Sequence, residues 1–209
     1  MKDSWTWTRR GIAIALVAVW SLTLFGGSTA AAPRTKPNLS FFTGGSGTAG
    51  WTASDPGSDL DSSAIALGVP GVSPPDFAGV EIKRAGASAP ATEPSFKFKS
   101  SVFPSASGGS PRLVLLWTDG TSELRPLTWS TTYQTVGGAG LGDWDNNGGT
   151  CGFLFATTYT ATVACHASAT LVAVFIVTDS GWLVNPYTHF IDEISYGGFI
   201  FTSPKDNAN

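Results

Sequence analysis

Residues Ser95–Ser101 read SFKFKSS, in which two phenylalanines alternate with two lysines. Successive side chains of a β-strand point to opposite faces of the sheet. The stretch therefore predicts a half-buried strand, with Phe96 and Phe98 facing a core and Lys97 and Lys99 facing water. Such a strand needs partner strands, and the rest of the chain has to supply them.

The partner strands are predicted from further short runs that are separated by Gly, Ser, Thr and Pro residues. The clear runs are Gly79–Lys83, Arg112–Trp117, Leu171–Thr178 and His189–Tyr196, and the weaker ones are Leu39–Thr43, Ala64–Leu67, Leu124–Leu127, Gly152–Ala156 and Phe199–Thr202. Asp119-Gly120 lies between two runs and predicts a hairpin turn. Many short strands with this spacing predict one all-β sandwich. The segment Tyr159–Cys165 fits a helix or a strand.

Two of the runs, Arg112–Trp117 and Leu171–Thr178, are apolar on both faces. Strands of this kind are typical of the middle of a sheet, where one face packs on the core. We expect the other face to be covered by a segment of the chain or to form a ligand groove.

The N-terminus has the three parts of a secretory signal peptide. Lys2, Arg9 and Arg10 precede an apolar run of 15 residues, Gly11–Phe25, and small residues follow it. The run is shorter than the roughly 20 residues that span a bilayer. We expect residues 1–31 to be removed and the protein to be secreted, by either the general or the twin-arginine route. An uncleaved membrane anchor is the alternative.

The predicted mature chain is mildly acidic. From Pro33 onward it has nine Lys and Arg against fourteen Asp and Glu, a net charge of −5. This balance, without a basic stripe, argues against binding to nucleic acid or to an anionic membrane. We expect a loose tail at residues 32–37, a single sandwich domain at 38–202 and a second loose tail at 203–209.

The two cysteines, Cys151 and Cys165, both lie in the mature chain. In an exported protein this spacing predicts one disulfide. A metal pair and a catalytic thiol are the alternatives, and His166 is the one further metal-ligand residue beside them.

The two ends of the domain resemble those of secreted carbohydrate-binding modules with the galactose-binding-like jelly-roll fold. At the N-terminal end, Asn38–Gly50 and Trp51 are followed by the strand-like Ser62–Leu67. At the other end, His189–Ile194 (HFIDEI) is similar to the last strand of these modules. The resemblance implies a jelly-roll sandwich that binds carbohydrate, and it implies that Asp192 helps to hold a structural calcium.

A second calcium motif starts at Asp143. Asp143, Asp145 and Asn147 supply oxygen atoms at positions 1, 3 and 5 of a loop, with Gly148 at position 6, as in an EF-hand. Leu154 occupies position 12, where a glutamate would complete that loop. The alternative is a polar turn before the disulfide. Apart from this possible calcium, we expect no cofactor.

Two tryptophans have the polar neighbours that a sugar-binding site needs. Sugar rings stack on aromatic faces, and their hydroxyl groups bind Asp, Asn or Gln side chains. Trp144 lies among acidic and amide residues, and Trp182 lies near Asp179, Asn185 and Tyr187. Packing in the core or in a loop is the alternative for each, and it is preferred for Trp117.

Catalytic patterns are absent from the sequence. The neighbours Asp192 and Glu193 point to opposite faces of a predicted strand and cannot flank a sugar together. His166 and His189 are predicted to be structural. We therefore expect a non-catalytic exported protein that binds polysaccharide. One alternative is a structural or protein-interaction role, and another is a small hydrolase.

Overall fold

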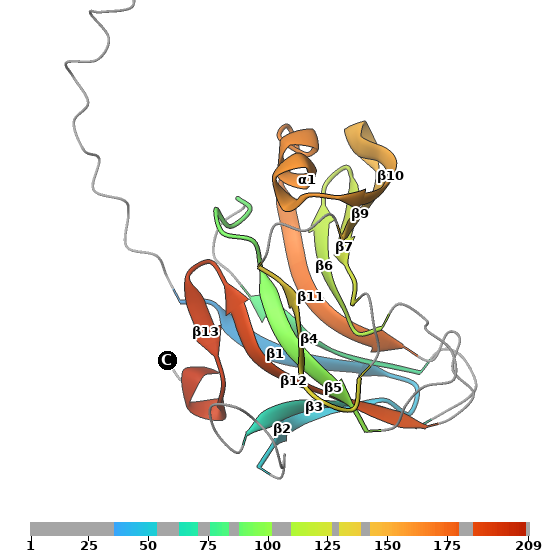
Figure 1. Ribbon diagram of the computed structural model, residues 1–209, viewed down its shortest axis with the longest axis vertical. Coiled ribbons are helices and arrows are strands. Elements are labelled where there is room, and N and C mark those ends of the chain that lie inside the picture. The colour runs from blue at the N-terminus through green and yellow to red at the C-terminus, as the bar shows by residue number, and fades with distance from the viewer. Residues whose placement is uncertain are drawn as a thin grey trace, which may run out of the picture. The chain divides into compact units, whose positions relative to one another are not determined.

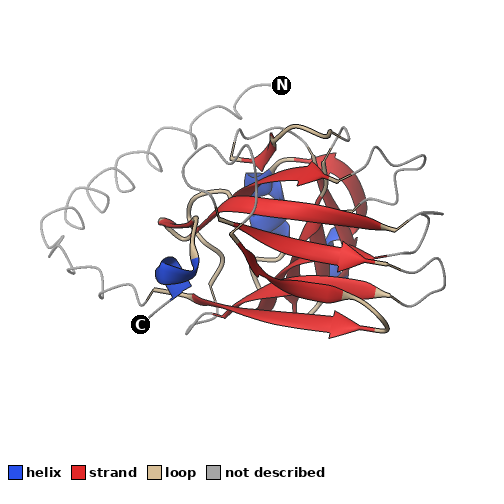
Figure 2. Ribbon diagram, turned by 90° about the horizontal axis from the view of Figure 1, so that it is seen from below, coloured by secondary structure: helices blue, strands red, loops and turns tan. Residues whose placement is uncertain are grey.

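The structure, a computed structural model, describes residues 36–53, 63–70, 76–83, 88–101, 110–126, 130–138, 143–179 and 186–207. The predicted signal peptide, residues 1–31, lies outside these ranges, as does most of the predicted N-terminal tail. Figure 2 shows that strands make up most of the described chain, and that helices contribute only short segments.

The strands form two antiparallel sheets, which confirms the predicted all-β sandwich. One sheet has the order β1 (Asn38–Gly44), β4 (Phe77–Lys83), β11 (Leu171–Asp179), β6 (Arg112–Trp117), β7 (Gly120–Leu124), β9 (Trp144–Gly148) and β10 (Gly152–Thr157). The other has the order β2 (Thr48–Thr52), β3 (Ala64–Val69), β12 (Tyr187–Tyr196), β5 (Ser95–Ser100) and β8 (Gln134–Gly137), and β13 (Phe199–Phe201) pairs with β12. Figure 1 labels these strands except β8.

The core lies between the inner faces of the two sheets. Phe96 and Phe98 of β5 are fully buried and Lys97 and Lys99 are partly exposed, as the alternation predicts. Leu113, Leu115 and Ile176 from the seven-stranded sheet belong to the same hydrophobic cluster. Burial of these side chains stabilises the fold, since each contributes about 1.5–3 kcal/mol relative to an exposed one.

Strands β6 and β11 are neighbours inside the seven-stranded sheet, which confirms that they are central. Part of their outer face is covered from within the sheet itself. The Phe42 ring lies over Gly79 so closely that any Cβ there would collide with it. The same ring packs edge-on against Phe175 of β11, with the ring centroids 5.6 Å apart.

The hairpin predicted at Asp119-Gly120 joins β6 to β7. Trp117 pairs with Gly120, so that Thr118 and Asp119 form the turn. Strand β7 therefore begins at Gly120 and ends at Leu124, whereas the sequence predicted a strand from Leu124 onward. Three short strands, β2, β8 and β9, were not predicted, because they contain few apolar residues.

The ambiguous segment Tyr159–Cys165 is helix α1. The Thr158 side chain caps it by accepting a hydrogen bond from the Ala161 amide at 3.2 Å. Figure 1 shows α1 at the same end of the sheet as β9 and β10. The predicted disulfide, Cys151–Cys165, joins this helix to the 3₁₀ turn η1 (Gly149–Cys151), with the Cα atoms 5.3 Å apart. Among the described residues, no helix is long and apolar enough to cross a membrane.

The residues after β13 were predicted as a loose tail, but they are bound to the first strand. They form the 3₁₀ turn η2 (Pro204–Asn207). Asn207 Oδ1 accepts a hydrogen bond from the Leu39 amide at 2.5 Å, and its Nδ2 donates to the Leu39 carbonyl at 2.9 Å. Asp206 accepts hydrogen bonds from the amides of Thr202 and Ser203, chiefly the former, which lower its pKa.

Candidate functional site

Trp144, predicted to stack on a sugar, lies on the inner face of β9. Its side chain is fully buried (0% exposed), and its ring centroid lies 5.4 Å from that of Tyr159 in α1. Its Nε1 donates a hydrogen bond to Glu93 Oε1 at 2.8 Å. A buried ring has no face open to a ligand, so the structure corrects this prediction in favour of the core alternative. Trp117 is also buried, as expected.

Tyr187 and Asp179, from the second predicted sugar site, do lie together. The Tyr187 hydroxyl donates to the Asp179 carbonyl, and the Thr178 hydroxyl donates to Tyr187 at 3.1 Å. Burial, together with the charge of Asp179, raises the pKa of Tyr187 to about 12. The Asp179 carboxylate is bound by Arg112 Nη2 at 2.6 Å. Both groups thus have protein partners, and Trp182 and Asn185 lie outside the described residues.

Residues of both predicted calcium sites lie in strands. Asp145 and Asn147 lie in strand β9 instead of a loop, and Asp192 lies in β12 of the other sheet. Asp145 accepts a hydrogen bond from the Ala156 amide at 3.1 Å and lies 3.6 Å from Arg125 Nη1. Burial raises the pKa of Asp143, with a further contribution from the charges of Glu93 and Asp145. Because Asp145 and Asn147 are held in a strand and Asp145 already lies beside a cation, the residues of the second motif do not fit an EF-hand calcium loop. The calcium site at Asp192 stays a prediction.

A chain of buried hydrogen bonds runs across the inner face of β6, β7 and β9. Trp117 Nε1 donates to Ser122 Oγ at 3.0 Å, and Ser122 donates to Asn146 Oδ1 at 2.7 Å. Asn146 Nδ2 then donates to Thr162 Oγ1 in α1 at 3.2 Å. These bonds fix helix α1 on the sheet independently of the disulfide.

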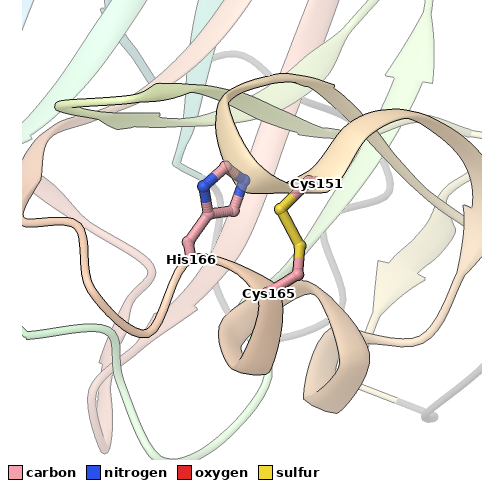
Figure 3. A group of neighbouring side chains, drawn as sticks. All are labelled: Cys151, Cys165 and His166. Carbon is pink, nitrogen blue, oxygen red and sulfur yellow. A yellow bond between two sulfur atoms is a disulfide. The ribbon is translucent and has the colours of Figure 1, made fainter.

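His166 follows α1 and lies beside the disulfide, as Figure 3 shows. Its ring stacks on Trp117, with centroids 4.9 Å apart and planes 9° from parallel. Nδ1 lies 2.7 Å from Asp119 Oδ1 in the β6–β7 turn. Partial burial acts to raise the pKa of Asp119, but the hydrogen bond and the charge of His166 outweigh it and hold the pKa below its usual value.

The outer face of the six-stranded sheet carries a feature that the sequence did not predict. Lys99 of β5 lies between two aromatic rings, with Nζ 4.9 Å from the centroid of Tyr133 and 5.3 Å from that of Phe190. Phe190 pairs with Lys99 in one direction and with Ala66 in the other, so these three side chains share the outer face. Tyr133 and Phe190 are each partly exposed.

A shallow depression of about 220 Å³ lies two residues further along the same strands. Its lining includes the hydroxyl groups of Thr48, Ser101 and Thr188. The Ser101 hydroxyl accepts a hydrogen bond from the Thr188 amide at 2.9 Å. The Thr48 hydroxyl lies over Gly68, while Gly50 on the same strand as Thr48 faces open space. The small residues keep this part of the sheet flat. Tyr187 also contributes to the lining.

Comparison with known proteins assigns the chain to no family. No protein family model matches it, and no curated protein matches it. Among solved structures, it is similar to the enzymatically active domain of bacteriophage CBA120 tailspike protein 4, with a TM-score of 0.39 and 12% sequence identity. The match covers 80% of this chain and 20% of that one, so the chain spans about a fifth of its length.

Proposed function

We propose that this domain binds carbohydrate on the outer face of its six-stranded sheet, without cleaving it. The observation that carries the proposal is the pair of partly exposed rings, Tyr133 and Phe190, on either side of Lys99. The apolar faces of sugar rings stack on such aromatic surfaces. A sugar chain running along the sheet would leave this aromatic pair and reach the neighbouring depression.

The depression offers the polar half of the same site. Hydroxyl groups both donate and accept hydrogen bonds, so Thr48, Thr188 and Ser101 suit the mixed requirements of sugar hydroxyls. Because Gly50 carries no side chain and faces open space, a flat ligand can approach the strand closely at that position. Lys99 adds a cationic donor, which favours sugars with anionic groups.

Two acidic residues of the described six-stranded sheet, Asp192 and Glu193, are engaged within the protein, which supports binding over hydrolysis. A glycosidase needs two carboxyl groups that flank the scissile bond. Asp192 is buried and accepts a hydrogen bond from the Glu193 amide at 2.7 Å. Glu193 pairs with Lys97 at 2.6 Å. With the predicted export signal, this favours a binding protein that acts outside the cytoplasm.

The proposal is tested by affinity electrophoresis of the mature protein in gels containing different neutral and anionic polysaccharides. We expect retardation by at least one of them. Phe190→Ala and Tyr133→Ala should each weaken binding about tenfold, which corresponds to ~1.4 kcal/mol. The control is Val172→Thr, which changes an exposed apolar side chain of the other sheet and should leave retardation unchanged. No retardation by any polysaccharide would overturn the proposal.

A steric variant separates loss of binding from loss of folding. A Cβ added at Gly50 meets no other heavy atom of the described residues within 4 Å, so we expect Gly50→Leu to fold normally. It should nevertheless block the flat face and abolish retardation. Equal retardation of Gly50→Leu and the wild type would place the ligand elsewhere.

The edge of strand β10 favours a second candidate function, protein interaction, with a second copy of the chain as the partner. Phe153, Leu154 and Phe155 are 73%, 44% and 72% exposed on the last strand of the seven-stranded sheet. Edge strands normally carry charges or proline that prevent pairing, and this strand has neither. Two identical neutral edges can pair without repulsion.

Sedimentation velocity over a range of protein concentrations tests this second candidate. The wild type should form dimers, and Phe153→Ser/Phe155→Ser should remain monomeric. A wild-type protein that is monomeric at all concentrations would exclude it.

A further inference from the structure

The cluster formed by Cys151, Cys165 and His166 has the composition of a metal site. One potential ligand atom from each residue lies within 4.8 Å of the other two. Zinc bound by two thiolates and an imidazole has Zn–S distances of about 2.3 Å and Zn–N distances of about 2.0 Å, which put its ligand atoms about 3.5–4 Å apart. The observed spacing therefore needs only small side-chain movements once the S–S bond is broken.

The second observation is a buried nitrogen without a partner. His166 is 1% exposed, and within the described part of the chain its Nε2 makes no hydrogen bond. Leaving such a group unsatisfied costs about 1–3 kcal/mol. Figure 3 shows one ring nitrogen directed towards the disulfide. Nδ1 is already engaged with Asp119, so Nε2 is the atom that is available to a ligand.

Asp119 fixes the chemistry of that nitrogen. A carboxylate accepts but does not donate, so in the neutral imidazole the single ring proton resides on Nδ1 and points to Asp119. Nε2 then carries a lone pair on the side of the two sulfur atoms. A carboxylate behind a metal-binding histidine is the arrangement that orients the ring and raises its basicity in zinc sites.

We propose that reduction of the Cys151–Cys165 disulfide converts this cluster into a zinc site, with Cys151 Sγ, Cys165 Sγ and His166 Nε2 as ligands. A dithiol reductant supplies two electrons and becomes a disulfide itself, while the two cysteines become thiols. Zinc binding then releases the two thiol protons, because thiolates are the ligands. Three protein ligands leave the fourth tetrahedral position for water.

The surroundings hold the ligands in place after the disulfide is opened. Thr150 Oγ1 donates to the Cys165 carbonyl at 2.5 Å and links η1 to the end of α1. Trp117 stacks on the His166 ring, and Asn146 bonds Thr162 in α1. Because these contacts do not involve sulfur, the reduced protein retains the two cysteines side by side. The disulfide and bound zinc exclude each other, so the site binds zinc only when the two cysteines are reduced.

The experiment titrates untagged mature protein with Co²⁺ and with Zn²⁺, after oxidation or after reduction by a phosphine. Reduced wild type should bind one equivalent, and Co²⁺ should give the thiolate charge-transfer absorption of a tetrahedral site. Oxidised wild type should give none. His166→Gln should weaken zinc binding at least tenfold, and Asp119→Asn should weaken it 10- to 100-fold.

Two controls keep the result interpretable. His189→Gln removes the other buried histidine and should bind zinc as the wild type does. Circular dichroism of each reduced protein shows whether the sandwich persists, and unfolded reduced chain in urea provides the reference for unstructured binding. The proposal fails if folded reduced protein binds no zinc, or if His166→Gln or the unfolded chain binds it equally well.

Discussion

Two buried histidines in different regions of this domain have different partners. His189 lies in the core between Phe98 and Tyr187, and its Nδ1 meets the Thr178 hydroxyl at 2.8 Å. His166 lies beside the disulfide, and its Nδ1 meets the Asp119 carboxylate at 2.7 Å. Burial lowers the pKa of His189 to about 3. The carboxylate beside His166 instead orients the His166 ring, so that its other nitrogen faces the disulfide. The two histidines are thus equally buried, but His189 only packs in the core, whereas His166 has a ring nitrogen that can bind a ligand.

The largest effect should come from removing the packing around His189. Phe98 is fully buried and contacts both His189 and Phe96. Phe98→Ala should lower the free energy of unfolding by about 3–5 kcal/mol, since it leaves a cavity in the core. Urea denaturation measures this, with Val172→Thr as an exposed control expected within ±0.5 kcal/mol. A loss below about 1 kcal/mol would show that the core repacks around the cavity.

A smaller effect is expected at the disulfide. Replacing both cysteines, Cys151→Ser/Cys165→Ser, should lower the free energy of unfolding by about 3 kcal/mol, because the unfolded chain loses a 14-residue cross-link. The variant should keep the far-ultraviolet spectrum of the wild type. If it unfolds at room temperature instead, the hydrogen bonds from β9 to α1 do not hold that end together, and the proposed zinc site would have no folded framework.

The pH dependence of stability should give the smallest effect and distinguish the two histidines most directly. The pKa of a histidine in the unfolded chain is about 6.5, and that of His189 in the folded protein is about 3. Between these two pH values, residue 189 is therefore protonated only in the unfolded chain. Stability should fall as pH decreases from about 6.5 towards 3, by about 2 kcal/mol at pH 5. Urea midpoints of the wild type and His189→Gln test this. Parallel pH profiles for the two proteins would contradict it.

The sequence predicted the core better than the surface. Phe96 and Phe98 face inwards because alternation in an amphipathic strand has one stable outcome. Strand β9 (WDNNG) was missed, because its polar residues favour turns and only its neighbours β7 and β10 make it a strand. Once it is a strand, alternation places Trp144 inside despite its acidic neighbours. Polar neighbours in the sequence therefore do not show whether a side chain faces the core or the solvent.

The candidate binding face could not be predicted because strand register creates it. Lys99 and Phe190 are far apart in the sequence and meet only because β5 pairs with β12 at that register. Tyr133 joins them from the segment just before β8. Similarly, the disulfide could be predicted because the mature chain has only two cysteines. The contact between Asp119 and His166 could not, because it depends on where the β6–β7 turn lies.

The order of strands has a consequence for how the chain folds during synthesis. Strand β11 joins β1 and β4 to the other four strands of its sheet, and β12 joins β2 and β3 to β5 and β8. Both joining strands lie late in the sequence, at Leu171–Asp179 and Tyr187–Tyr196. A ribosome that has reached residue 170 has therefore made four sheet fragments and no sandwich. Since pairing between such distant segments is slow, the chain stays open until its last strands emerge. Of the two predicted export routes, the general secretory channel is the one that requires an unfolded chain, so this order of strands is compatible with it.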